Sequence, residues 1–311
     1  MNARLSRLAA LMLVFQIALQ SEGFSQNREK SEAKPARRKV TLKVLDVGAE
    51  PRSVLRYRFN EGTSETMVMD MTMSMAMELG GRKIPEQKIP MTRTTMTIAS
   101  DKVTEKGDLE QSFELIGVDV VSKPGDNPAI VAAMNQQMGK MVGLQGTCTL
   151  TSRGFASNAS IKTPPKADLK LQQLLDGMSQ SIEQMSAPLP EEAVGKGAKW
   201  QTTMPIEMNG MKLTQIVRYT VKEIKGDKLV VDILIDQDAE EQQFSPPGVP
   251  ATVTLKSLET TGTATAEVSL STLVPKTTTK IETTNVIETN GQRVKTRVNT
   301  SMKVYPQPTS K

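Results

Sequence analysis

Six methionines alternate with other residues along one short segment, residues 67–77, which reads MVMDMTMSMAM. In an extended strand, alternate side chains point to opposite faces of a sheet, so all six thioethers would share one face. This set comprises Met67, Met69, Met71, Met73, Met75 and Met77. Thioether side chains are flexible and polarizable, and they bind apolar groups or soft ions such as Cu(I) and Ag(I).

Other residues offer little catalytic chemistry. The chain contains no histidine, which is the most common general base and metal ligand. Its one cysteine, Cys148, alternates with Gly146 and Leu150 in an apolar strand pattern, and no histidine is present to activate the thiol. We therefore predict a protein that is not an enzyme and that needs no cofactor and no metal.

Strands must position the methionines, because apolar and polar residues alternate through most of the chain. Before residue 150 this pattern predicts strands at 40–47, 54–59, 65–79, 91–103, 109–121 and 144–150. Asn-Gly pairs at 209–210 and 290–291 are strong hairpin signals, and glycines at 80–81, 226 and 262 predict further turns. Later strands are predicted at 200–208, 211–224, 229–235, 253–259, 264–273, 276–289 and 292–305.

Two helices are predicted, at residues 128–142 and 168–186. Asn127 is a favourable N-cap for the first, and Pro128 suits its first position. Each helix has an apolar stripe at helical spacing that must cover another surface. The candidate ligand-binding residues on these stripes are Met134, Met138 and Met141 in the first helix, and Leu171, Leu174, Leu175, Met178, Ile182 and Met185 in the second.

The predicted fold is mainly β, with two helices. Long hairpin-connected strands twist, so we expect a curved antiparallel sheet, or half-open barrel, with both amphipathic helices packed on its concave face. We place one β-rich domain at 40–306. A short echo between 103–109 and 221–229 leaves open a division into halves at about 40–163 and 190–306.

The N-terminus has the layout of a secretory signal peptide at residues 1–25. Arg4 and Arg7 precede a short apolar run at 8–19, and small residues mark a cleavage site. This run is too short to span a membrane, and no later segment approaches spanning length. We expect export to a periplasmic or extracellular location, with a soluble mature chain.

Charge is concentrated in a basic leader at residues 26–39, which has six basic and two acidic residues and which we expect to be disordered. The body from Val40 onward is neutral, and the whole chain has only ten aromatic residues. Nucleic-acid surfaces need basic grooves and stacking aromatics, so we exclude that class of partner. The sequence does not exclude a protein or polymer partner in the cell envelope.

Two segments carry a family resemblance. They read VLRYRFNEG at 54–62 and LPEEAVGKGAKW at 189–200, and each leads into a predicted strand. In these segments the chain resembles an uncharacterised family of exported bacterial proteins. Its element order resembles the lipoprotein-carrier superfamily, which implies an unclosed barrel with a helical lid over a hydrophobic cavity. The resemblance supplies no catalytic residue.

Three functions are consistent with the methionine strand. The first is binding of a lipid, another apolar ligand or a lipid-modified protein between the methionine face and a helical lid. The second is an envelope structural or interaction module, in which the same face is a solid core. The third is a Cu(I) or Ag(I) site made of thioethers.

Overall fold

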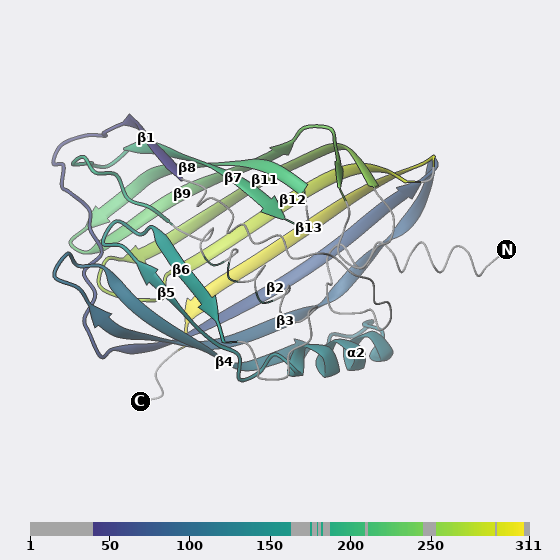
Figure 1. The fold of residues 1–311 in the computed structure, drawn as a ribbon, viewed down its shortest axis with the longest axis horizontal. Coiled ribbons are helices and arrows are strands. Elements are labelled where there is room, and N and C mark those ends of the chain that lie inside the picture. Colours follow the sequence, from purple (N-terminus) through teal and green to yellow (C-terminus); the bar gives the residue numbers. More distant parts are fainter. Residues whose placement is uncertain are drawn as a thin grey trace, which may run out of the picture.

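The computed structural model describes residues 40–162, 175, 179, 182, 187–208, 211–244, 253–289 and 291–307. In this part of the chain, thirteen strands form one antiparallel sheet (Figure 1). The strands before residue 162 are β1 (Thr41–Asp46), β2 (Ser64–Leu79), β3 (Arg82–Val103), β4 (Leu109–Val121), β5 (Gln145–Leu150) and β6 (Ala156–Ile161). The later strands are β7 (Lys199–Met208), β8 (Met211–Lys225), β9 (Lys228–Ala239), β10 (Gln242–Phe244), β11 (Val253–Ser269), β12 (Lys276–Thr289) and β13 (Gln292–Pro306).

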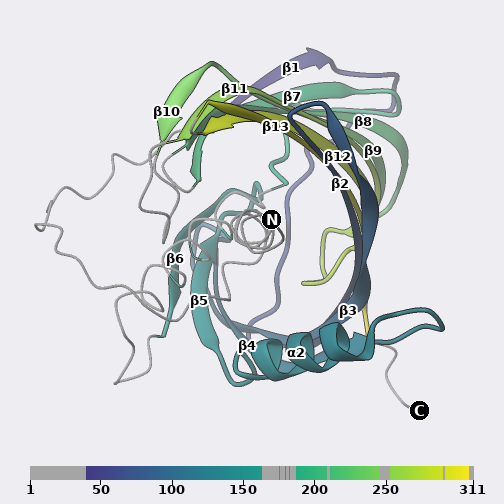
Figure 2. The same cartoon turned by 90° about the vertical axis from the view of Figure 1, so that its right-hand side faces the viewer.

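The order of strands across the sheet is β1-β7-β8-β9-β11-β12-β13-β2-β3-β4-β5-β6, and β10 pairs with β11 beside this path. Figure 2 shows the sheet curving around a hollow, with β4, β5 and β6 opposite β1, β7 and β11. The sheet is not closed, because β1 and β6 at its two ends do not pair. The predicted β class and half-open curvature are therefore correct.

Four predicted hairpins are present. The paired residues at their ends are Leu79 and Arg82, Met208 and Met211, Lys225 and Lys228, and Thr289 and Gln292. These hairpins fix the register of long neighbouring strands, so glycine turn chemistry was a sound guide to this half of the topology.

Three strand predictions are wrong. Residues 54–59 form no strand; Leu55 and Tyr57 instead pack in a hydrophobic cluster with Trp200 and Tyr219. Gly262 is not a turn but the middle of β11, where a Cβ would lie 3.2 Å from Ile281 Cγ1. Strand β3 begins at Arg82 rather than Met91, since Pro85 and Pro90 lie within irregularities of its pairing with β2.

The predicted pair of amphipathic helices on the concave face is also wrong. The helix that the described ranges contain, α2 (Pro128–Gly139), starts after the predicted N-cap, and Ala129 N donates to Asn127 Oδ1 at 2.9 Å. None of its residues is buried, and it packs against β4. Val120 N of β4 donates to Asn135 Oδ1 at 3.1 Å. Val120 lies in the part of β4 that extends beyond its pairing with β5, so α2 supplies a hydrogen-bond acceptor there.

Most of the second predicted helix lies outside the described residues, including Leu171, Leu174, Met178 and Met185. Leu175 is buried, and Ile182 is half-buried. Within the described ranges, no helix is long and apolar enough to cross a membrane.

A charged cluster ties the methionine strand to both of its neighbours. Arg93 of β3 donates to Asp70 of β2 through Nε (2.7 Å to Oδ1) and Nη2 (2.8 Å to Oδ2). Tyr305 of β13 donates its hydroxyl to Asp70 Oδ2 at 3.1 Å. The Arg93 hydrogen bonds, aided by Tyr305, hold the pKa of the Asp70 carboxyl below its usual range. This lowered pKa makes the cluster a source of stability that depends on pH.

We expect Asp70→Asn to cost about 1 kcal/mol at neutral pH, because Arg93 is partly exposed and its ion pair is screened. A lowered pKa stabilises the fold above the pKa of the unfolded carboxyl, and that stability is lost as pH falls through the folded value. Wild type should therefore lose more stability than the variant below about pH 4. Urea unfolding at several pH values measures this difference in stability. Glu105→Gln is the control, because Glu105 is an exposed turn residue. Equal acid sensitivity of wild type and Asp70→Asn would contradict the assignment.

Candidate functional site on the concave face

A row of paired residues crosses the sheet and fixes which face carries the methionines. The row runs through Trp200, Tyr219, Ile233, Ala264, Thr279, Met302, Met71 and Thr92, one residue from each of eight neighbouring strands. Directly paired residues of antiparallel strands project from the same face. The methionine strand therefore shares its face with Trp200, which lies six strands away.

This shared face is the concave one, because two loop segments cross the hollow and pack on it. We call residues 51–59 and 187–198 the plug. Tyr57 N donates to Ser152 O in the β5–β6 turn (2.8 Å), and Arg58 N donates to Leu270 O after β11 (2.6 Å). These bonds join opposite arms of the sheet, and Figure 2 shows the chain between β1 and β2 running through the interior.

The plug forms a closed hydrophobic cluster with the Trp200 end of the face. Leu55, Leu189 and Val194 pack with Trp200, Tyr219 and neighbouring residues, and all of them are buried. Trp200 stacks on Tyr219 with ring centroids 5.2 Å apart, and its Nε1 donates to Pro188 O at 3.0 Å. Burial raises the pKa of Tyr219 to about 12, so its phenol stays neutral at physiological pH.

The methionine strand has one buried part and one half-buried part. Met75 and Met77 are buried and pack with Val298 of β13. Met67, Met69, Met71 and Met73 are only half-buried. Met96 pairs with Met67, Met302 pairs with Met71, and both are half-buried as well. We call the six half-buried residues the methionine surface: Met67, Met69, Met71, Met73, Met96 and Met302.

The structure thus brings together the candidates on β2 but not those on α2. Met134, Met138 and Met141 are half-buried on or just after a helix that packs against β4. Met96 and Met302 were missed, because single alternating methionines in β3 and β13 give no sign of which strand they will face. Only the register of the folded sheet pairs them with β2.

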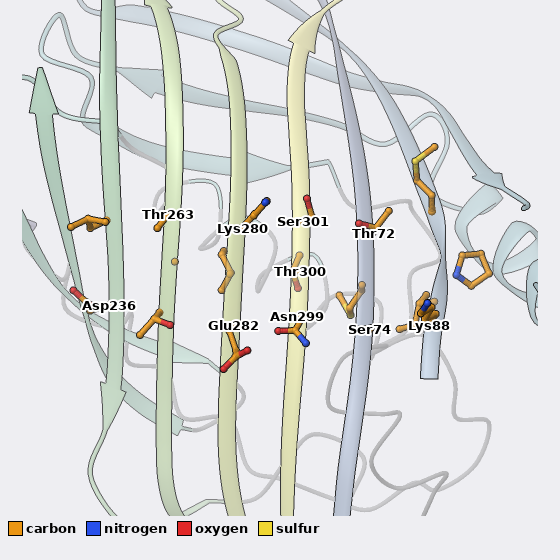
Figure 3. Close-up of a pocket in the computed structure, with 18 of the residues that line it drawn as sticks. Thr72, Ser74, Lys88, Asp236, Thr263, Lys280, Glu282, Asn299, Thr300 and Ser301 are labelled. Atoms are coloured by element: carbon orange, nitrogen blue, oxygen red, sulfur yellow. The ribbon is translucent and has the colours of Figure 1, made fainter. Parts of the chain in front are cut away.

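A groove of about 800 Å³ lies on the opposite, convex face (Figure 3). Most residues that line it alternate along their strands with residues of the concave face, so they project from the opposite face. Arg218 follows Val217, and Leu234 and Asp236 lie on either side of Ile235. Thr72 and Ser74 likewise flank Met73. Figure 3 shows Lys280, Glu282, Asn299 and Ser301 side by side on β12 and β13. Met73 is the one predicted site residue at its border, so sequence reasoning missed this groove.

The groove has a mixed polar and apolar lining, and some of its charged side chains form ion pairs. Arg218 forms an ion pair with Asp236, while Leu234, which lies on β9 opposite Arg218, is 51 % exposed. Lys88 of β3 and Lys123 of the β4–α2 connection line its other side. Such a mixture of hydroxyls and charges with apolar side chains, among them Leu234 and Ile281, is typical of surfaces that bind other proteins.

Across the described ranges, no group of three or more His, Cys, Asp or Glu side chains could hold a metal ion. No curated protein matches the sequence. One family model matches the part of the chain that runs from β6 through the Trp200 cluster to the loop after β11, and this part excludes the methionine strand. Residues 155–273 match the model of DUF6263, a family of unknown function.

Proposed function

We propose that this protein is an exported, non-enzymatic binder of apolar ligands, such as the acyl chain of a lipid or of a lipid-modified protein. The methionine surface on the concave face is the proposed binding site. The observation that carries the proposal is that these side chains are half-buried, whereas Met75 and Met77 on the same strand face are packed into core. A helical lid is not part of the proposal.

The position of the site favours an elongated ligand. Beside the methionine surface along the same face, Ile233 and Ile281 are half-buried, and the plug seals the Trp200 end. An acyl chain that buries about 200 Å² of apolar surface there would gain about 5 kcal/mol before ordering costs. The features of a signal peptide at 1–25 and the resemblance of element order to lipoprotein carriers support the same reading.

We expect Met71→Asp to abolish binding of a dansyl-labelled fatty acid to the full chain, because a carboxylate on the concave face costs free energy against an apolar ligand. The matched control is Thr72→Asp, which places the same charge on the same strand but on the convex face. Fluorescence titration measures binding, and circular dichroism with thermal unfolding verifies that both variants fold.

Two outcomes would sink the proposal. In one, folded wild type binds the labelled fatty acid no better than folded Met71→Asp. In the other, Thr72→Asp abolishes binding to the same extent. Mass spectrometry of an organic extract from natively purified protein adds an independent readout, since a lipid at one copy per chain would identify the ligand class directly.

The convex groove favours a second candidate, a module that docks a protein or polymer of the envelope. The specific observation is the exposed Leu234 within a groove of about 800 Å³ whose lining mixes polar and apolar side chains. Under this alternative the methionine surface is structural. Leu234→Asp would then abolish partner binding, and wild type itself would not bind the labelled fatty acid.

A further inference from the structure

The methionine surface contains a group of thioethers whose spacing suits a single ion. Met71 of β2 and Met302 of β13 are a directly opposed antiparallel pair. Such pairs have Cβ atoms about 4.5–5.5 Å apart, and each methionine has three rotatable side-chain bonds with which to bring its sulfur closer. Met69 and Met73 are the next residues of β2 on the same face, about 7 Å to either side. Two thioethers are therefore directly opposed, and a third is within reach.

We propose that this group binds one soft monovalent ion, Cu(I) or Ag(I). Met71 and Met302 are the principal ligands, and Met69 or Met73 is the third. Thioether sulfur prefers these ions to hard or borderline cations, which favour oxygen and nitrogen ligands. The proposal goes beyond apolar ligand binding, because it depends on sulfur rather than on apolar area.

The surroundings favour a soft ion over a hard one. The direct neighbours of the group across the sheet carry no charge. Thr92 lies opposite Met71, and Ile89 and Thr300 lie opposite Met73. Thr94 and Val304 lie opposite Met69. The acidic residue between Met69 and Met71, Asp70, lies on the convex face, where Arg93 and Tyr305 already bind its carboxylate. The concave site is therefore neutral, which suits a weakly hydrated monovalent ion better than a divalent cation.

Accessibility separates these methionines from their neighbours on the same strand. Met69, Met71, Met73 and Met302 are half-buried, so part of each side chain is open to solvent. Met75 is 4 % exposed and Met77 is 8 % exposed, and both pack against Val298. The chain thus offers a matched control, because two thioethers of the same strand face can be removed without touching the proposed site.

The test uses Ag(I) itself, titrated into the full chain and followed by isothermal calorimetry, with native mass spectrometry for stoichiometry. The background is Cys148→Ala, because the thiol of Cys148 is also a soft ligand even though it is buried. We expect one tight site per chain. The double variant Met71→Leu with Met302→Leu should weaken Ag(I) binding by more than about 100-fold.

The control double variant Met75→Leu with Met77→Leu should leave Ag(I) affinity within about twofold, since leucine conserves volume and the removed sulfurs are buried. Equal loss in both double variants, or tight binding that survives removal of Met71 and Met302, would overturn the proposal. Fatty-acid binding is the separate readout. The double variant Met71→Leu with Met302→Leu should still bind the fatty acid. If the apolar-ligand proposal is wrong, wild type itself will not bind the fatty acid.

Discussion

Gly195→Ala is expected to destabilise the protein by at least about 3 kcal/mol. A Cβ on Gly195 would lie 1.8 Å from Ala49 O and 3.0 Å from Pro51 O, and neither backbone oxygen can move like the end of a side chain. The amide of Gly195 also donates to Val47 O at 2.9 Å, so shifting this residue away breaks a bond between the plug and the segment after β1. Urea unfolding followed by circular dichroism measures the loss.

Gly197→Ala is the matched control. Gly197 has φ +83°, so alanine there is strained, but no heavy atom lies within 4 Å of the added Cβ. Its expected cost is about 1 kcal/mol, from the left-handed backbone alone. If Gly195→Ala proves as stable as Gly197→Ala, the close approach of Gly195 to residues 47–51 is not present in solution.

Trp200→Ala is the second large effect that we expect, with a loss of about 3–5 kcal/mol. Trp200 is 1 % exposed, stacks on Tyr219, and is the largest side chain in the cluster under the plug. Its removal leaves a cavity and also leaves Pro188 O without its indole donor. Urea unfolding of the variant measures this loss against wild type.

Trp200→Phe separates packing from hydrogen bonding. Phenylalanine keeps an aromatic ring beside Tyr219 but cannot donate to Pro188 O, so its expected cost is smaller, about 1–3 kcal/mol. A Trp200→Ala variant no less stable than Trp200→Phe would show that the plug does not pack on this end of the sheet.

Local sequence patterns were a reliable guide to the sheet. Alternation predicted β2, β4, β8 and the final hairpin, because successive side chains of a strand project to opposite faces of the sheet. Where apolar alternation serves another purpose the same rule failed. Leu55 and Tyr57 alternate as in a strand, yet they belong to the plug.

Glycine and proline misled for opposite reasons. Gly262 resembles a turn, but in β11 it lies between Ile235 and Ile281, where a larger side chain would have tight contacts on both sides. Pro85 and Pro90 argue against a strand, yet β3 accommodates them at irregularities in its pairing. Neither outcome follows from residues close in sequence.

The candidate site was predictable only in its first strand. The spacing of Met67 to Met77 was sufficient to place six thioethers on one face, and β13 pairs with β2 without a shift in register. Met96 and Met302 join them through pairings that span 29 and 231 positions of the chain. The helical stripe of Met134 and Met138 predicted a lid, but a stripe does not specify which surface it meets, and α2 packs against β4.

The prolines of β3 also bear on how molecules of this protein meet one another. Residues 82–90 extend beyond the pairing of β3 with β4, which begins at Met91, so one side of this stretch has no strand partner in the described sheet. Such a free edge can add a strand from another copy and grow into fibres. Pro85 and Pro90 lack the amide hydrogens that strand addition requires, and Lys83 and Lys88 are exposed charges. The irregular stretch of β3 is thereby a poor template for adding a strand from another molecule.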